Sequence, residues 1–167
     1  MSFDHRRTVT FRLAQAAHAY RVRSGSRLAR IELHSGQEHL LKALGESDGQ
    51  SMSDLAAVLG VQPPTVTKMI SRLAAQDYVE RRASKGDGRQ ALVFLTERGK
   101  RAIAAVDKVW KRIEKEAVAG IDEKDRKRFR KFLRQIERNL GVAANGDDHE
   151  FIGDDENDST VVELPAA

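Results

Sequence analysis

The chain has 167 residues, of which 32% are charged and only 5% aromatic, and it contains no cysteine. This length is enough for one domain with a buried core, and the lack of cysteine excludes disulfides and thiol-based redox sensing. No apolar run approaches the roughly 20 residues that span a bilayer, which predicts a cytoplasmic protein.

Charge is unevenly distributed along the chain, although the formal net charge is only +4. From Asn145 onward there is no Lys or Arg, so residues 1–144 hold all 29 basic side chains, 17 acidic ones and a net charge of +12. Such a cationic field favours polyanionic partners. The C-terminal end is expected to be a disordered, solubilising tail. Its eight acidic residues are Asp147, Asp148, Glu150, Asp154, Asp155, Glu156, Asp158 and Glu163.

The N-terminal segment 5–30 is rich in arginine and contains no acidic residue. Its apolar side chains are frequent enough to predict one long helix that packs into the fold. The same composition is also typical of a mitochondrial transit peptide, which remains an alternative interpretation of this segment.

Two short amphipathic helices are predicted further along, separated by a tight turn. The first stops at Gly60, because a left-handed residue commonly ends a helix. The second begins near Pro63, since Pro63 and Pro64 lack amide protons that would have no intrahelical partner in a first turn. The apolar residues of the first helix, all expected to face inward, are Leu55, Ala56, Val58 and Leu59.

The second helix has an apolar and a polar face. Its apolar residues recur at i, i+3, i+4 and i+7 and are Val66, Met69, Ile70 and Leu73. The polar residues can hydrogen-bond base edges and phosphates when such a helix enters a major groove. They are Thr65, Thr67, Lys68, Ser71, Arg72 and Gln76. Taken alone, this polar face is more typical of an ordinary solvated helix, because most amphipathic helices bind nothing.

A β-hairpin is predicted directly after this helix. Strands are expected at Tyr78–Ala83 and Gln90–Leu95, with a glycine-rich turn at Ser84–Arg89. Cations gather there, where a wing can contact a phosphate backbone or a minor groove. They are Arg81, Arg82, Lys85 and Arg89. Helix and hairpin together predict a winged helix-turn-helix, and hence a mainly α fold with a small β-hairpin wing.

The wing and the residues after it carry two recognisable motifs. The turn contains Asp87-Gly88-Arg89, and the second strand leads into Leu95-Thr96-Glu97-Arg98-Gly99. With the preceding helices, these motifs resemble the DNA-binding core of the MarR family of transcriptional regulators. The resemblance implies that Asp87 braces the wing and that Arg89 reaches the minor groove of DNA.

Two further helices are expected after the wing, capped by Thr96 and Asp122. Their apolar stripes and that of the N-terminal helix are too broad for the winged core to cover, so we expect all three to pack against a second subunit. The alternative is a monomer in which these stripes contact only each other. The stripes after the wing comprise Ile103, Val106, Val109, Trp110 and Ile113, then Phe129, Phe132, Leu133, Ile136 and Leu140.

The chain is therefore divided into four parts. Residues 1–34 form an N-terminal dimerisation helix and 35–96 the winged helix-turn-helix core. Residues 97–141 form the C-terminal dimerisation helices and 142–167 the acidic tail.

The predicted function is sequence-specific transcriptional regulation, in the simplest case repression, by a homodimer on a pseudo-palindromic operator in double-stranded DNA. Base contacts are assigned to Pro64, Thr65, Thr67, Lys68 and Arg72. Phosphate contacts are assigned to Ser53, Arg81, Arg82 and Lys85. An architectural protein that coats DNA through charge alone is the alternative. A further hypothesis is that the acidic tail folds over the basic face and competes with DNA.

The resemblance also implies a small, often aromatic effector between the dimerisation helices and the winged core. Candidate lining residues are Tyr20, Arg23, His34, His39 and Trp110, none of which the spacing identifies. Glu38 and His39 could begin a zinc site, but the helix after the wing offers no further His, so no metal or cofactor is expected. The sequence lacks a phosphate-binding glycine loop, a metalloprotease His pair and a nucleophile elbow, so it predicts no enzyme.

Overall fold

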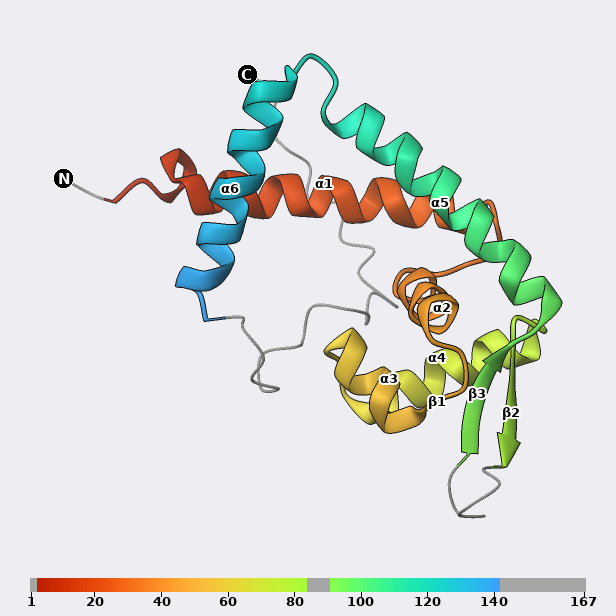
Figure 1. The fold of residues 1–167 in the computed structure, drawn as a ribbon. Coiled ribbons are helices and arrows are strands. Elements are labelled where there is room, and N and C mark those ends of the chain that lie inside the picture. The colour runs from red at the N-terminus through yellow and green to blue at the C-terminus, as the bar shows by residue number, and fades with distance from the viewer. Residues whose placement is uncertain (1–2, 84–90, 142–167) are drawn as a thin grey trace.

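The computed structural model describes residues 3–83 and 91–141 of the chain. Helices dominate it, and a small sheet lies beside α4 (Figure 1). The predicted fold class, mainly α with a β-hairpin wing, is confirmed. In chain order the elements are the 3-10 helix η1 (His5–Arg7), α1 (Val9–Ala29), α2 (Gln37–Glu46), β1 (Gln50–Ser51), α3 (Met52–Leu59), α4 (Pro63–Ala75), β2 (Val79–Ala83), β3 (Ala91–Leu95), α5 (Glu97–Ala117) and α6 (Glu123–Asn139).

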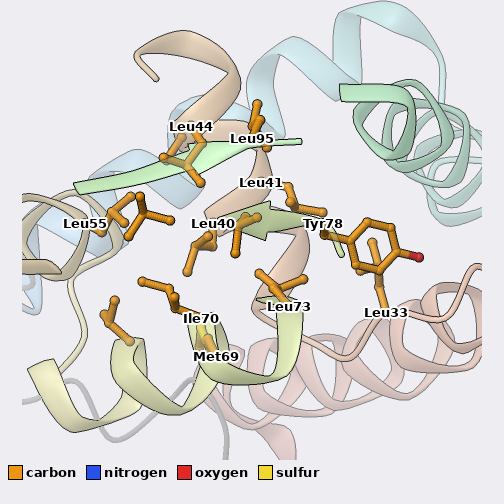
Figure 2. Close-up of a cluster of buried hydrophobic side chains, with 14 of the residues drawn as sticks. Leu33, Leu40, Leu41, Leu44, Leu55, Met69, Ile70, Leu73, Tyr78 and Leu95 are labelled. Carbon is orange, nitrogen blue, oxygen red and sulfur yellow. The ribbon is translucent and has the colours of Figure 1, made fainter. Parts of the chain in front are cut away.

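The core is built around α2, which packs against α3 and α5. Figure 2 shows Leu40, Leu41 and Leu44 of α2 among the buried side chains of this core. Leu40 and Leu41 of α2 are fully buried, as are Ile70 and Leu73 of α4. The predicted apolar stripe of α4 therefore faces the core. The same cluster includes Leu28 and Leu33, which precede α2, and Val106 of α5, so one continuous core crosses the domain boundaries expected at residues 34 and 96. Those boundaries remain a prediction.

One inward-facing assignment in α3 was wrong. Leu55 and Ala56 are buried and Leu59 is partly buried, but Val58 is 64% exposed. Positions 55, 56 and 59 share one side of the helix, whereas position 58 points to a different side. An eight-residue helix that packs on α2 and α4 with one side leaves the other side in solvent.

The predicted hairpin is present, with strands at Val79–Ala83 and Ala91–Leu95 that pair antiparallel from Val79↔Leu95 to Ala83↔Ala91. A third strand, β1, pairs with the other edge of β3 through Gln50↔Val93. β1 was not predicted from the sequence, because two residues are too few to show strand alternation.

The caps proposed for the last two helices are present. The Thr96 side chain accepts a hydrogen bond from Gly99 N at the start of α5, and the Asp122 side chain accepts one from Asp125 N at the start of α6. α5 buries Val106 and Ile113, whereas α6 buries no residue within the protomer. Among residues 3–83 and 91–141, no helix combines the length and apolar character that crossing a bilayer demands.

Candidate DNA-binding surface

The start of α4 is fixed by a tight connection from α3. Gly60 adopts the left-handed conformation (φ 64°, ψ 33°) and ends α3, as predicted. Gln62 then stands at the N-cap of α4 without a side-chain cap hydrogen bond, and Pro63 and Pro64 follow in the first turn. The prolines supply the preset φ that a side-chain cap would otherwise help to enforce.

The polar face of α4 lies in solvent, opposite the buried stripe. Pro64, Thr67, Lys68 and Arg72 are exposed, whereas Thr65 at the edge of the face is only half-exposed. Figure 2 shows Met69, Ile70 and Leu73 of the same helix directed toward the core. The residues assigned to base contacts therefore lie where a major groove could reach them.

Two hydroxyl groups on this face are held by hydrogen bonds along the helix. Thr67 Oγ1 donates to Pro63 O at 3.0 Å, and Ser71 Oγ donates to Thr67 O at 2.9 Å. Each hydroxyl oxygen keeps its lone pairs available as acceptors. Ser71 uses one of them to accept a hydrogen bond from Arg81 Nη2 at 3.0 Å.

The two arginines of β2 extend from opposite faces of the sheet, as neighbours in a strand do. Arg81 turns toward α4 and contacts Ser71. Arg82 forms an ion pair with Glu80, and its guanidinium lies 4.6 Å from the centre of the Phe94 ring. Only Arg81 is thus joined to the polar face of α4, although both arginines were assigned to phosphate.

The N-terminus of α3 carries a capping box. The Ser51 side chain accepts from Asp54 N at 3.1 Å, and Asp54 Oδ2 accepts from Ser51 N at 3.3 Å. Ser53, assigned to a phosphate contact, is exposed in this first turn. A phosphate there would meet the positive end of the helix dipole. The Ser-x-x-Asp spacing is a local sequence signal that could have located this helix start.

Three assigned site residues, Lys85, Asp87 and Arg89, lie outside the described residues, as does the glycine-rich turn of the wing. Ser71 was recognised only as part of the polar face. Its hydroxyl contact with Arg81 depends on how the strand is placed in space, which sequence periodicity does not specify.

Some candidate effector residues come together where α1, α2 and α5 meet. Tyr20 and Trp110 line one cavity of about 340 Å³, and the rings of His39 and Trp110 lie 5.4 Å apart. Arg23 Nε instead contacts Glu116 Oε2 at 3.0 Å, while the His34 backbone N donates to Gln37 Oε1. His39 and Trp110 thus lie together, and no structural observation joins His34 to them.

Buried polar side chains at the same junction were not predicted. Arg27 is 9% exposed and forms an ion pair with Glu116, yet its Nε has no hydrogen-bond partner. Glu38 is 4% exposed and its Oε2 also lacks a partner. Burial raises the pKa of the Glu38 carboxyl, against the opposing effects of backbone hydrogen bonds and His39.

Metal coordination has no geometric basis in the part of the chain that the structure describes. No group of three or more His, Asp or Glu side chains within those ranges could hold an ion. His39 Nε2 lies 3.6 Å from Glu38 Oε1, but no third ligand joins this pair.

Comparison with known proteins relates the central part of the chain to one family. The MarR family model matches residues 33–91. The transcriptional regulator TtmR of Methylorubrum extorquens is 34% identical over 90 residues, which cover 54% of this chain but only 46% of TtmR. The uncharacterised regulator YwoH of Bacillus subtilis is 27% identical over 139 residues, which cover 81% of this chain and all of YwoH.

A solved structure agrees with this at the level of the fold. BpsR of Bordetella bronchiseptica, whose DNA binding is regulated by 6-hydroxynicotinic acid, superposes with a TM-score of 0.73 at 20% identity, over 82% of this chain and 98% of BpsR. Residues 33–91 therefore match the MarR family, and the whole described chain shares the fold of its solved members.

Proposed function

We propose that the protein is a sequence-specific regulator, in the simplest case a repressor, which binds a pseudo-palindromic operator as a homodimer. The observation that carries the proposal is the Arg81–Ser71 hydrogen bond, because it holds a cation of the wing strand against the exposed polar face of α4. When such a helix enters the major groove, a cation held beside its polar face can reach the adjacent phosphate backbone.

Within this proposal the side chains divide into two groups. Pro64, Thr65, Thr67, Lys68 and Arg72 contact base edges in the major groove. Ser53, Arg81, Arg82 and Lys85 contact phosphates, while Asp87 braces the wing and Arg89 enters the minor groove. Two copies of α4 about 34 Å apart would read half-sites one turn of DNA apart.

Dimerisation is supported by where apolar side chains remain exposed. They concentrate on α1 and α6, outside the core formed around α2 (Figure 1). Phe129 and Phe132 of α6 are each 52% exposed, and Val9 of α1 is 72% exposed. A second copy of the chain would bury these residues. The helices within residues 1–34 and 97–141 would then form the dimer interface, beside the winged core of residues 35–96.

We also propose that a small aromatic effector binds at the junction of α1, α2 and α5. The cavity lined by Tyr20 and Trp110 supports this, since aromatic walls suit an aromatic ligand. The two α4 helices of a dimer can have a spacing that fits DNA or one that does not. An effector changes the affinity for DNA only if it binds one of these two conformations more tightly than the other. The regulation of BpsR by 6-hydroxynicotinic acid gives a precedent within the same fold.

Footprinting on the DNA upstream of the protein's own gene tests the proposal. A protected pseudo-palindrome, bound by two protomers and retained against excess random DNA at physiological salt, is the expected result. An architectural protein would instead protect all sequences alike and would lose binding to random competitor.

Three substitutions refine the test. Lys68→Ala should cost about 1–3 kcal/mol on the operator and relax sequence preference, whereas Lys85→Ala should weaken all sequences alike and flatten the salt dependence. Lys108→Ala on α5 is the charge-matched control, because Lys108 is exposed but lies outside the proposed surface. Equal losses from Lys68→Ala and Lys108→Ala would contradict the assignment of α4 as the recognition helix.

A further inference from the structure

One side of α6 carries a continuous row of cations. Lys124, Lys127, Lys131, Arg134 and Arg138 recur at alternating intervals of three and four residues, and all five are exposed. At about 100° per residue these positions fall within a narrow stripe that runs about 21 Å along the helix. We call these five residues the cationic row.

The cationic row lies opposite the apolar side of α6. At the same angular step, the apolar residues centre about 180° around the helix from the row. They are Phe129, Phe132, Leu133, Ile136 and Leu140. A partner that covers the apolar side therefore leaves the row in solvent, so dimerisation through α6 does not account for it.

The row is not neutralised by α6 itself. Within the described residues, no side-chain hydrogen bond or ion pair involves Lys124, Lys127, Lys131 or Arg134, and the Arg138 side chain hydrogen-bonds only to the neutral side chain of Gln135. The acid nearest the start of the row, Glu123, is paired with Arg130 at 3.4 Å. Like charges three and four residues apart repel each other on a helix, so the row favours an anionic occupant.

We propose that the cationic row is the docking site for the acidic C-terminal segment, residues 142–167, of the same protomer. This segment carries eight acids and no Lys or Arg, so its charge complements the row. It begins directly after α6, which ends at Asn139, and Gly141 with φ 70° lets the chain turn away from the helix axis.

Length and attachment both favour this occupant. A random-coil chain of 26 residues would have a mean end-to-end distance of about 28 Å, enough to follow the row from Arg138 back to Lys124. Because the segment is covalently attached, its effective concentration at the row is in the millimolar range. DNA that competes for the row must bind from solution. Its non-specific binding has dissociation constants of about 10⁻⁴ to 10⁻⁶ M.

Docking would neutralise a cationic surface that is separate from α4 and the wing. With the row covered, DNA would be directed to α4 and the wing, and the segment would increase the preference for operator over random DNA. In this arrangement the segment lies on α6 and not on the DNA-binding face.

Paramagnetic relaxation enhancement tests the proposal in the full-length protein. Because the chain contains no cysteine, Ser159→Cys gives one attachment site for a nitroxide within the acidic segment. Backbone amides of Lys127, Lys131 and Arg134 should broaden at ~50 mM salt and recover at ~500 mM salt, where the Debye length falls. Neutralisation of Asp147, Asp148, Asp154 and Asp155 to Asn should abolish the broadening.

Two matched variants separate docking on the row from general charge attraction. Lys124, Lys127, Lys131 and Arg134 are replaced by Gln in the first variant, which should lose the broadening. The second replaces four exposed cations of α5 by Gln and should retain it, since the net charge changes equally. Those cations are Arg101, Lys108, Lys111 and Lys115.

Several results would overturn the proposal. Broadening that persists in the α6 variant, falls on α4 and β2, or is absent everywhere would each exclude docking on the row. If random-sequence duplex shifts the row's amides equally with and without residues 142–167, the row is a DNA site. Broadening in a mixture of ¹⁵N-labelled protein and unlabelled, nitroxide-bearing protein would assign the segment to the partner subunit.

Discussion

Arg81 on β2 and Ser71 on α4 are joined by a hydrogen bond of 3.0 Å from Nη2 to Oγ. Ser71 is itself fixed, because its hydroxyl donates to Thr67 O at 2.9 Å one turn earlier in the helix. The Arg81 guanidinium of β2 is therefore positioned by α4, and the two proposed DNA-contacting elements are not independent.

This coupling predicts non-additive effects on DNA binding. Arg81→Ala should weaken operator binding and reduce the salt slope by about 1, because one phosphate contact is lost. Ser71→Ala should weaken binding less, since it frees Arg81 without removing its charge. In the double variant, Ser71→Ala should add little to Arg81→Ala, as measured by a double-mutant cycle in titrations.

The free energy of unfolding of the same variants is the control for the double-mutant cycle. Both residues are exposed, so each substitution should change the free energy of unfolding by no more than about 0.5 kcal/mol. Strictly additive losses of DNA affinity would show that Ser71 does not position Arg81.

Gly99 should tolerate no side chain. A Cβ at this position would lie 2.0 Å from Tyr78 O and 3.0 Å from Leu95 Cδ2. The Tyr78 carbonyl cannot move freely, because it accepts a hydrogen bond from Thr96 N at 3.1 Å. We expect Gly99→Ala to destabilise the protein by about 1–3 kcal/mol despite the better helix propensity of Ala.

Gly25→Ala is the matched control in α1, where the new Cβ would meet only Ser35 Oγ at 3.5 Å. That substitution should raise stability by up to about 1 kcal/mol. Thermal or urea unfolding of the two variants measures both effects. Similar shifts of the same sign would refute the packing argument at Gly99.

The elements that sequence reasoning located correctly are those set by local rules. The period of Val66, Met69, Ile70 and Leu73 defined the buried side of α4, and Gly60 marked the end of α3. Such features depend on a few neighbouring residues, so they can be read directly from a sequence.

The features that could not be predicted from the sequence depend on contacts between segments that are far apart in the chain. Val58 follows an apolar pattern but lies outside the contact between α3 and its neighbours. Arg27 and Glu38 are charged residues that a sequence would place in solvent, yet both side chains are buried in the fold. The Arg81–Ser71 contact likewise depends on strand placement.

The apolar side of α6 predicts how to dissociate the proposed dimer. Phe132→Glu places a charge among side chains that a partner would bury, so the protein should become monomeric in size-exclusion chromatography with light scattering. Lys131→Glu on the opposite side of the same helix is the control and should leave the oligomeric state unchanged. A Phe132→Glu protein with parental mass would exclude this side as the interface.

The ion pairs of Glu116, which join α5 to α1, should make the stability of the protein depend on pH in acid. Hydrogen bonds from Arg27 and Arg23 lower the pKa of the Glu116 carboxyl to about 2. A depressed pKa contributes stability above the unfolded value near 4.5, and this contribution is lost as pH falls toward 2. Glu116→Gln should therefore lower Tm at pH 7 and flatten the decline between pH 5 and 2.

Other carboxylates also titrate in this range, so the comparison must be made with the parent protein at each pH. Glu114→Gln on the same helix, where Glu114 is exposed and forms no ion pair among the described residues, serves as the control. A Tm difference between the Glu116→Gln variant and the parent that does not change with pH would argue against the arginine contacts as its cause.

Glu38 is expected to show the opposite pH dependence. Burial raises the pKa of its carboxyl above 4.5, so the folded state binds this proton more tightly than the unfolded chain does. Stability must then fall as pH rises through that raised pKa, because ionisation leaves a buried charge with an unpartnered Oε2. Glu38→Gln removes the charge and should raise Tm at pH 7 by ~2–4 °C, corresponding to about 1 kcal/mol for a chain of this size. The advantage should vanish below pH 4.5, where the parent carboxyl is also neutral, and a lower Tm for Glu38→Gln at pH 7 would mean that the ionised carboxylate stabilises the fold.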